Sequence, residues 1–244
     1  MKRKFLILLF FLGINHSARS MDNFLTKSNK SIQRHSLYNH AARSHAITLY
    51  NQFSNNKKAI EKELQKINPV EIRIAIAKQF FFLFGDIEIS DLSNERAKEK
   101  RSKQFLNIGV DYNFTVQELL DNNKLPDIEK SNITKGEPIF FTLDLRFLKI
   151  KSLKGLTEIN NYETITDILL DGNKINKIKD NAFKNSKGLI LLSLKYNNLC
   201  QIDVNAFKKL PNIGELFLVK TYLSDLDKQR ICTGLPSTNI YFSK

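Results

Sequence analysis

The sequence predicts an α+β protein, in which a helical N-terminal region is followed by a short solenoid of parallel strands. Two observations predict this division. Apolar residues follow helical spacing within residues 21–135, and a 24-residue pattern then repeats within residues 136–244. A basic and apolar leader, residues 1–20, precedes both regions.

The leader has the pattern of a signal peptide. Residues 2–4 are basic, residues 5–14 are apolar apart from one glycine, and small residues occupy positions 18 and 20. The apolar run is shorter than the roughly 20 residues that span a bilayer, and no second run follows. We therefore expect cleavage before Met21, export to a secreted or periplasmic location, and no transmembrane segment after cleavage. A buried helix is the alternative.

The chain is basic, with a formal net charge of +13 at pH 7. Cleavage would remove four basic residues and no acidic one, which lowers the charge to +9. Such a charge is compatible with nucleic acid or an anionic membrane. The lysines, however, are scattered among Asn, Ile and Phe, as A·T-rich codons would also produce. The densest run, residues 96–103, has no aromatic residue to stack on a base. We interpret it as a solvated helix face or loop, and we do not expect nucleic-acid binding.

Helical spacing covers residues 36–53, residues 57–84 with Pro69 as a divider, and residues 116–122. Thr115 and Glu118 form a capping-box signature at the start of the last segment. Residues 72–84 are apolar nearly all round, which predicts a buried helix in the core of this half. No family resemblance is evident for residues 21–135.

The repeat unit combines alternating apolar residues, one asparagine and an Ala-Phe pair. Its first complete copy places them at Ile165, Ile168, Leu170, Asn173, Ile175, Ile178, Ala182 and Phe183. The pattern returns 24 residues later at Leu189 and again at Ile213, and its register reaches Ile240 and Phe242. The third copy has apolar residues at Ile213, Leu216, Leu218, Leu223 and Leu226. A looser first copy begins at Leu143, one residue out of step and without the asparagine.

This pattern resembles the 24-residue leucine-rich repeats found in many extracellular and bacterial surface proteins. The resemblance covers roughly residues 139–244 and implies about four coils with parallel strands on a concave face. In such a unit the leucines point inward and the asparagine satisfies backbone groups at the turn. We expect Phe183 and Phe207 to stack, and the asparagine ladder to loosen at Thr221, which replaces the asparagine in the third copy.

The first coil needs a cover for its strand edge and its core leucines. The helical segment that ends near Leu125 and Pro126 is the candidate cap, which would make residues 21–135 an N-terminal cap. Cys200 and Cys232 lie in different parts of successive coils. We expect them to be semi-buried free thiols, because a disulfide requires Cα atoms within about 7 Å; a disulfide is the alternative.

The sequence contains no catalytic or metal-binding pattern. The histidines stand at positions 16, 35, 40 and 45, and five-residue steps do not place ligands on one helical face. Glycine-rich phosphate cradles do not occur. Some bacterial effectors fuse such repeats to a cysteine-dependent ubiquitin ligase, but its Cys-x-Asp motif is absent. We expect no enzyme activity and no cofactor.

A partner protein is expected on the concave face, because residues between the inward leucines point there. The candidate residues are Asp167, Leu169, Asp171, Leu191, Ser193, Lys195, Tyr196, Glu215, Phe217, Val219, Lys220 and Tyr222. We expect the apolar ones to form a cluster rimmed by charges. The favoured function is an exported protein-recognition module, adaptor-like or effector-like. The alternative is a structural or envelope-associated protein whose repeats pack against its own helical half.

Overall fold

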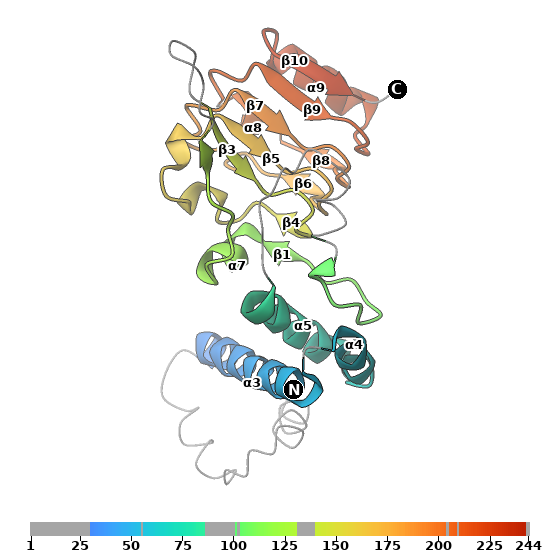
Figure 1. The fold of residues 1–244 in the computed structure, drawn as a ribbon. Helices are drawn as coiled ribbons and strands as arrows, with labels where there is room; N and C mark the ends of the chain where they lie inside the picture. Colours follow the sequence, from blue (N-terminus) through green and yellow to red (C-terminus); the bar gives the residue numbers. More distant parts are fainter. Residues whose placement is uncertain are drawn as a thin grey trace. The chain divides into compact units, whose positions relative to one another are not determined.

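The computed structural model describes residues 30–54, 56–85, 101, 103–130, 140–203, 205–208 and 210–242. The leader and most of the basic run 96–103 lie outside these residues. The chain forms two compact units (Figure 1). They are Met1–Asp86 with Lys103–Tyr112, and Ile87–Ser102 with Asn113–Lys244. Residues 113–130, which the sequence assigned to the N-terminal region, thus belong to the same unit as the repeats.

The first unit contains the helices α3 (Lys30–Phe53), α4 (Lys57–Gln65) and α5 (Val70–Phe84). These confirm the two predicted helical segments and the division at Pro69, which is the N-cap residue of α5. The side chain of Asn56 caps α4 by accepting a hydrogen bond from the amide of Ala59. The helices therefore begin where proline and a capping side chain place them.

Helix α5 supplies the core of this unit. Its buried residues are Ile72, Ile76, Ala77, Phe80 and Phe81, while Val70 is exposed and its remaining apolar residues are half-exposed. The ring of Phe81 stacks on Phe105 at 5.1 Å between centroids. Arg73 donates a hydrogen bond of 2.8 Å to the carbonyl of Ile108. Residues 103–112 therefore pack back onto α5, although they are distant from it in sequence.

The second unit is built on a six-stranded sheet with the order β10-β9-β7-β5-β3-β2. Its strands are β2 (Glu129–Lys130), β3 (Phe141–Asp144), β5 (Asp167–Leu169), β7 (Leu191–Ser193), β9 (Glu215–Leu218) and β10 (Asn239–Phe242). All neighbours are parallel except β2 and β3. Figure 1 shows β3, β5, β7, β9 and β10 side by side, one from each repeat.

The strand register follows the sequence repeat. Asp167 pairs with Leu191, which pairs with Glu215, in steps of 24 residues. Leu143 pairs with Ile168, a step of 25, so the first copy is one residue out of step, as predicted. A short second row of strands comprises β4 (Ile150–Ser152), β6 (Lys177–Ile178) and β8 (Gln201–Ile202), of which β6 and β8 pair in parallel.

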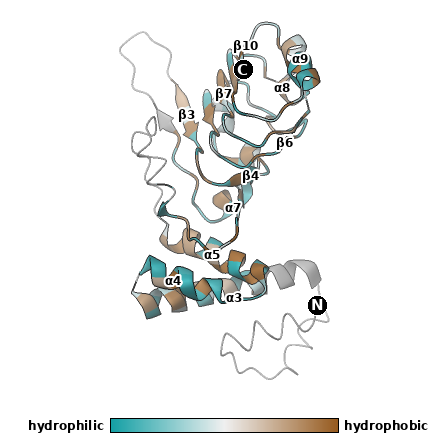
Figure 2. Ribbon diagram, turned by 90° about the vertical axis from the view of Figure 1, so that its right-hand side faces the viewer, coloured by the Kyte–Doolittle hydropathy of each residue, from teal (hydrophilic) through white to brown (hydrophobic). Residues whose placement is uncertain are grey.

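Apolar side chains from both rows form a continuous core between them. The predicted inward positions of the first and second complete repeats are all buried, and Figure 2 shows hydrophobic residues along β3 and β7. Phe183 and Phe207 stack with centroids 6.0 Å apart, as predicted. Each repeat buries its leucines against the next one, so a single repeat could not be stable alone.

The asparagine ladder joins successive repeats. The carbonyl oxygen of Asn173 accepts hydrogen bonds from the amides of Leu148 and Ile150, and its amide donates to the carbonyls of Leu145 and Leu170. Asn197 repeats this arrangement one unit later. These side chains satisfy buried backbone groups where the chain leaves each strand.

The third complete repeat departs from this pattern. The hydroxyl of Thr221 donates to the carbonyl of Leu218 within its own repeat, which fits the expected loosening. Helix α9 (Asp225–Gly234) then replaces a second-row strand, and its helical spacing buries Ile231. The expectation that Leu226 continues the inward series is wrong: its side chain is 56% exposed, because the helix turns it away from the core.

One backbone position is left-handed in four successive repeats. It is occupied by Phe147, Gly172, Tyr196 and Lys220, with φ between 56° and 66°. Only Gly172 is a glycine, and a Cβ there would lie 2.2 Å from the ring of Phe147. The glycine is thus required by the aromatic neighbour in the preceding repeat as well as by the backbone angle.

Residues 113–130 pair with strands of the first repeat. Strand β1 (Phe114–Thr115) pairs with β4, and β2 pairs with β3. The predicted capping box of Thr115 and Glu118 is present at the start of helix α7 (Val116–Asp121). The amide of Gln117 also donates to the carbonyl of Lys154 in the first repeat.

Both cysteines, Cys200 and Cys232, are free thiols. Both are exposed, whereas the sequence predicted semi-buried side chains. Cys232 lies on the outer side of α9, a helix that the repeat pattern did not indicate. Among the described residues, no helix is both long and apolar enough to cross a membrane.

Candidate protein-binding surface

The side chains that alternate with the buried leucines form one face of the six-stranded sheet, which we call the outer face. Strand pairing arranges them in three rows that cross the strands. The first row contains Asp167, Leu191 and Glu215; the second contains Asp144, Leu169, Ser193, Phe217 and Tyr241; the third contains Asp171, Lys195 and Val219. The repeat register therefore places these eleven side chains on one face of the sheet.

The N-terminal end of the outer face is closed. The carboxylate of Asp144 accepts hydrogen bonds from Nε and Nη2 of Arg146, at 3.1 and 2.8 Å. Nη1 of Arg101 lies 3.6 Å from the same carboxylate and donates to the carbonyl of Arg146. Asp144 and Arg101 are only 2% and 1% exposed. A segment from outside the repeats thus covers the first repeat with a buried cation.

This ion-pair cluster was not predicted. Asp144 lies in the atypical first copy, and its place in the outer row follows from the shifted register. Arg101 is distant in sequence and belongs to a run that we interpreted as a solvated surface. No local pattern could indicate that this arginine folds onto the sheet.

The middle of the outer face is held together by hydrogen bonds. The hydroxyl of Ser193 donates to Oδ1 of Asp171 at 2.5 Å, and the amide of Lys195 donates to the same oxygen at 2.9 Å. Ser193 consequently has an exposed fraction of 2%, although it lies in an outward row. Asp171 keeps the serine hydroxyl from direct contact with a partner. Burial raises the pKa of Asp171, whereas these hydrogen bonds and the charge of Lys195 lower it.

The C-terminal end of the outer face is open and aromatic. Phe217 stacks on Tyr241 with centroids 4.4 Å apart and an interplanar angle of 9°. The ammonium of Lys195 lies 4.2 Å from the centroid of the Phe217 ring, within cation–π range. Tyr241 is 41% exposed. The repeat pattern predicted Phe217 and Lys195 as surface residues but not Tyr241, which the same register places beside Phe217.

The first row carries two carboxylates on either side of an aliphatic residue. Asp167 and Glu215 flank Leu191, and all three are half-exposed. Burial raises the pKa of Asp167, hydrogen bonds from Thr142 and Thr166 lower it, and the charge of Glu215 raises it further. The ionised form of Asp167 is therefore held at some cost in the unliganded protein.

The strand register places polar residues beside each of the apolar candidates. Leu169 and Phe217 share a row but are separated by Ser193. Leu191 lies between two carboxylates, and Val219 stands in the third row beside Lys195. The registers of successive strands interleave polar and apolar residues, so the outer face is a mixed surface with one aromatic pair.

Three further candidates lie at the rim. Tyr196 and Tyr222 are 60% and 74% exposed, and Lys220 is exposed as well. The left-handed backbone at Tyr196 and Lys220 turns these side chains away from the core at the end of each strand. They are accessible to a partner that covers the outer face.

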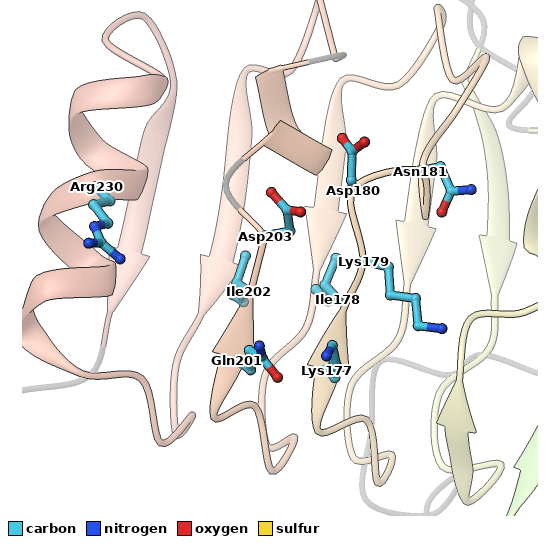
Figure 3. Close-up of a pocket in the computed structure, with 9 residues that line it drawn as sticks. All are labelled: Lys177, Ile178, Lys179, Asp180, Asn181, Gln201, Ile202, Asp203 and Arg230. Atoms are coloured by element: carbon cyan, nitrogen blue, oxygen red, sulfur yellow. The ribbon is translucent and has the colours of Figure 1, made fainter.

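A separate groove of about 730 Å³ lies on the other side of the repeats, beside β6, β8 and α9 (Figure 3). Its lining mixes Lys177, Lys179 and Arg230 with Asp180 and Asp203. Within the described part of the chain, no three metal-ligating side chains come together. Figure 3 shows these charged side chains spread over several elements. We find no arrangement here that indicates chemistry.

Comparison with known families agrees with the repeat register. Residues 163–223, about a quarter of the chain, match the family model described as leucine rich repeat. No curated protein matches the chain. The matched segment contains β5, β7 and β9, whose parallel pairing places the candidate residues in rows. Domains with such repeats commonly bind other proteins. Residues 163–223 are therefore leucine-rich repeats.

Proposed function

We propose that the chain is an exported, non-enzymatic recognition module that binds a partner protein through the open end of its outer face. The observation that carries this proposal is the stacked pair Phe217 and Tyr241, in which Phe217 is half-exposed and Tyr241 is 41% exposed. Exposed aromatic rings on a rigid support lose little entropy on binding and are frequent hot spots.

The architecture supports this proposal. Five parallel strands in register, each from one repeat, favour a short solenoid whose concave side is the outer face. Strands β1 and β2, with helix α7, pair or pack at the edge of the first repeat, which supports a capping role for residues 113–130. Export is supported by the composition of residues 1–20, and its test is whether the N-terminus of the secreted protein is Met21.

The proposal is tested by comparing partner capture between the full chain and a variant of the open end. The double change Leu169→Asp and Phe217→Asp should abolish capture, because it places new charges in the second row. The matched control is Gln201→Ala, an exposed change on β8. The proposal requires a partner retained by wild type and by the control and lost by the double variant. Far-UV and near-UV circular dichroism should show that all three proteins are folded.

The single substitution Phe217→Ala tests whether the pair Phe217 and Tyr241 belongs to the surface or to the core. Phe217→Ala should weaken partner binding by at least about tenfold and lower the free energy of unfolding by only about 1 kcal/mol, because the ring is half-exposed. Unfolding by this change alone would mean that the aromatic pair belongs to the core, and the recognition proposal would then be wrong.

The second candidate function is a structural or envelope-associated protein that covers its own repeats. The observation that favours it is the burial of Asp144 beneath Arg101. A residue from outside the repeats already covers part of the outer face of the first repeat. Hydroxyl-radical footprinting of the full chain distinguishes the two functions. Strong labelling of Phe217 and Tyr241 supports recognition of another protein, whereas protection of both rings supports the structural function.

A further inference from the structure

We propose that the partner presents an extended basic segment to the outer face, with an arginine above Leu191 between Asp167 and Glu215 and an adjacent apolar side chain against Tyr241. This inference rests on the proposed recognition function and adds the chemistry of the partner. It is carried by the charge distribution of the sheet face, by the spacing of its rows and by an arginine that the chain already places on this face.

The charge of the outer face is opposite to that of the chain. The whole chain has a formal charge of +13, yet the open part of the three rows carries Asp167, Asp171 and Glu215 against a single lysine, Lys195. That lysine is engaged with the ring of Phe217 and lies near Asp171. Arg146 also acts on Asp171 and lowers its pKa, so the negative charge that a cationic partner complements is that of Asp167 and Glu215 in the first row.

The first row has the spacing for one cation. Asp167 and Glu215 stand on β5 and β9, with β7 between them. Two strand spacings are about 9–10 Å, so a guanidinium above Leu191 lies within about 5 Å of both carboxylates. Burial and the charge of Glu215 raise the pKa of Asp167, so the ionised form of Asp167 is costly when no cation lies near it. An added cation removes this cost, and the aliphatic stem of an arginine packs on Leu191.

The closed end shows that an arginine can bind this sheet face. Arg101 comes from outside the repeats, reaches the carboxylate of Asp144 in the second row, and is 1% exposed there. Arg146 binds the same carboxylate in a fork geometry. An arginine from a partner segment would make the same kind of contact two or three strands further along. The planar guanidinium suits two carboxylates better than the compact ammonium of lysine.

The aromatic pair selects an apolar neighbour for that arginine. The ring of Phe217 is contacted by Tyr241 from β10 and by Lys195, which follows β7, and these two strands flank β9 on opposite sides. A partner side chain therefore meets the ring edges of Phe217 and the exposed part of Tyr241. An aliphatic or aromatic partner residue fits these surfaces. An acidic partner residue would be repelled by Glu215, which lies on the same strand as Phe217. The carboxylates likewise repel nucleic-acid phosphates.

The inference is tested by selecting random linear peptides of about 12 residues, displayed on phage, against the full chain. Selected peptides are synthesised with a fluorescent label, and their affinity is measured by anisotropy. The first variant is Asp167→Asn with Glu215→Gln, which keeps side-chain size and removes both charges. Phe217→Ala tests the aromatic pair, and Gln201→Ala on β8 is the matched control.

We expect the enriched peptides to carry arginine next to an apolar residue. The charge-neutral double variant should weaken their binding by at least about tenfold, Phe217→Ala should weaken it similarly, and the control should leave it unchanged. Replacing the peptide arginine by citrulline should cause the same loss as the double variant. Affinity should fall as salt is raised, because partly exposed charges are screened.

Two results would overturn the inference without touching the recognition proposal. The first is a set of peptides that bind Phe217→Ala more weakly but are neutral or acidic, or that keep their affinity for the charge-neutral double variant. Such peptides would show that the outer face binds protein by other chemistry. Failure to enrich any peptide would show that the face does not take an extended segment, and the capture experiment with Leu169→Asp and Phe217→Asp would then decide recognition separately. Enriched peptides insensitive to every outer-face change would contradict both.

Discussion

The two ends of the outer face have the same backbone but opposite environments. At the N-terminal end, Asp144 is buried under Arg101 and Arg146, and no part of its side chain is free for a partner. At the C-terminal end, Phe217, Tyr241 and Glu215 stand on equally regular strands but remain partly exposed. Strand geometry is therefore not what distinguishes a binding surface from a structural contact here.

The difference lies in what covers each end. A side chain from outside the repeats supplies the cation at the closed end, and the sheet then needs no partner there. At the open end the acidic and aromatic side chains contact only their neighbours on the sheet in the described structure. The repeats therefore provide rows of side-chain positions, and the segments that pack around the repeats determine which of these side chains remain accessible.

The largest expected effect tests what both ends share. Leu194 is fully buried in the core beneath the sheet. Leu194→Asp should unfold the repeat unit, because it places an unpaired carboxylate in an apolar core at a cost of more than about 4 kcal/mol. Loss of the cooperative urea transition of this unit would be the readout. The conservative change Leu194→Met should cost less than about 1.5 kcal/mol and serves as its control. A folded Leu194→Asp protein would contradict a shared core.

The next prediction compares the two ends directly. Asp144→Asn should lower the free energy of unfolding by about 3–5 kcal/mol, because it leaves the buried guanidinium of Arg101 without its anion. Glu215→Gln at the open end should change stability by less than about 0.5 kcal/mol, since its side chain is partly solvated. Urea denaturation of both variants measures the contrast. Equal effects would mean that the open end is structurally as closed as the other.

A smaller contrast concerns the hydrogen-bond ladder beneath the face. Asn173→Ala removes four hydrogen bonds that link two repeats and should cost about 2–3 kcal/mol, because buried backbone groups are left unsatisfied. Thr221→Ala removes a bond within one repeat and should cost no more than about 1 kcal/mol. Hydrogen exchange of the amides of Leu148 and Ile150 should accelerate in the first variant and not in the second. Acceleration in both would show that the repeats are coupled by other contacts.

The smallest expected effect is a pH dependence at the open end. The pKa of Asp167 is raised above its ordinary value of 3.8, so the folded protein binds this proton more tightly than the unfolded chain. Its contribution to stability therefore falls as pH rises through the interval between the ordinary and the raised pKa. Asp167→Asn removes this loss and should gain stability relative to wild type between about pH 3 and pH 7. Urea unfolding of wild type and of Asp167→Asn at both pH values measures this gain. If the difference in free energy of unfolding between the two proteins is the same at both pH values, the raised pKa is contradicted.

Much of the architecture was determined by the sequence itself. The 24-residue spacing predicted the strands, the buried leucines, the stacking of Phe183 on Phe207 and the role of Asn173, because each depends on a short pattern that recurs. The helices around Pro69 and the capping box at Thr115 were likewise predictable from local signals. Row membership on the outer face followed from the period of two along a strand.

Tertiary structure alone decided which of these positions are accessible. The contact between Arg101 and Asp144 joins segments with no common pattern, and the stacking of Phe217 on Tyr241 depends on the lateral register of β9 and β10. The replacement of a strand by α9 exposed Leu226 against the repeat pattern. Periodic spacing determines which way a side chain points, whereas its burial and charge environment depend on distant residues that the fold brings to it.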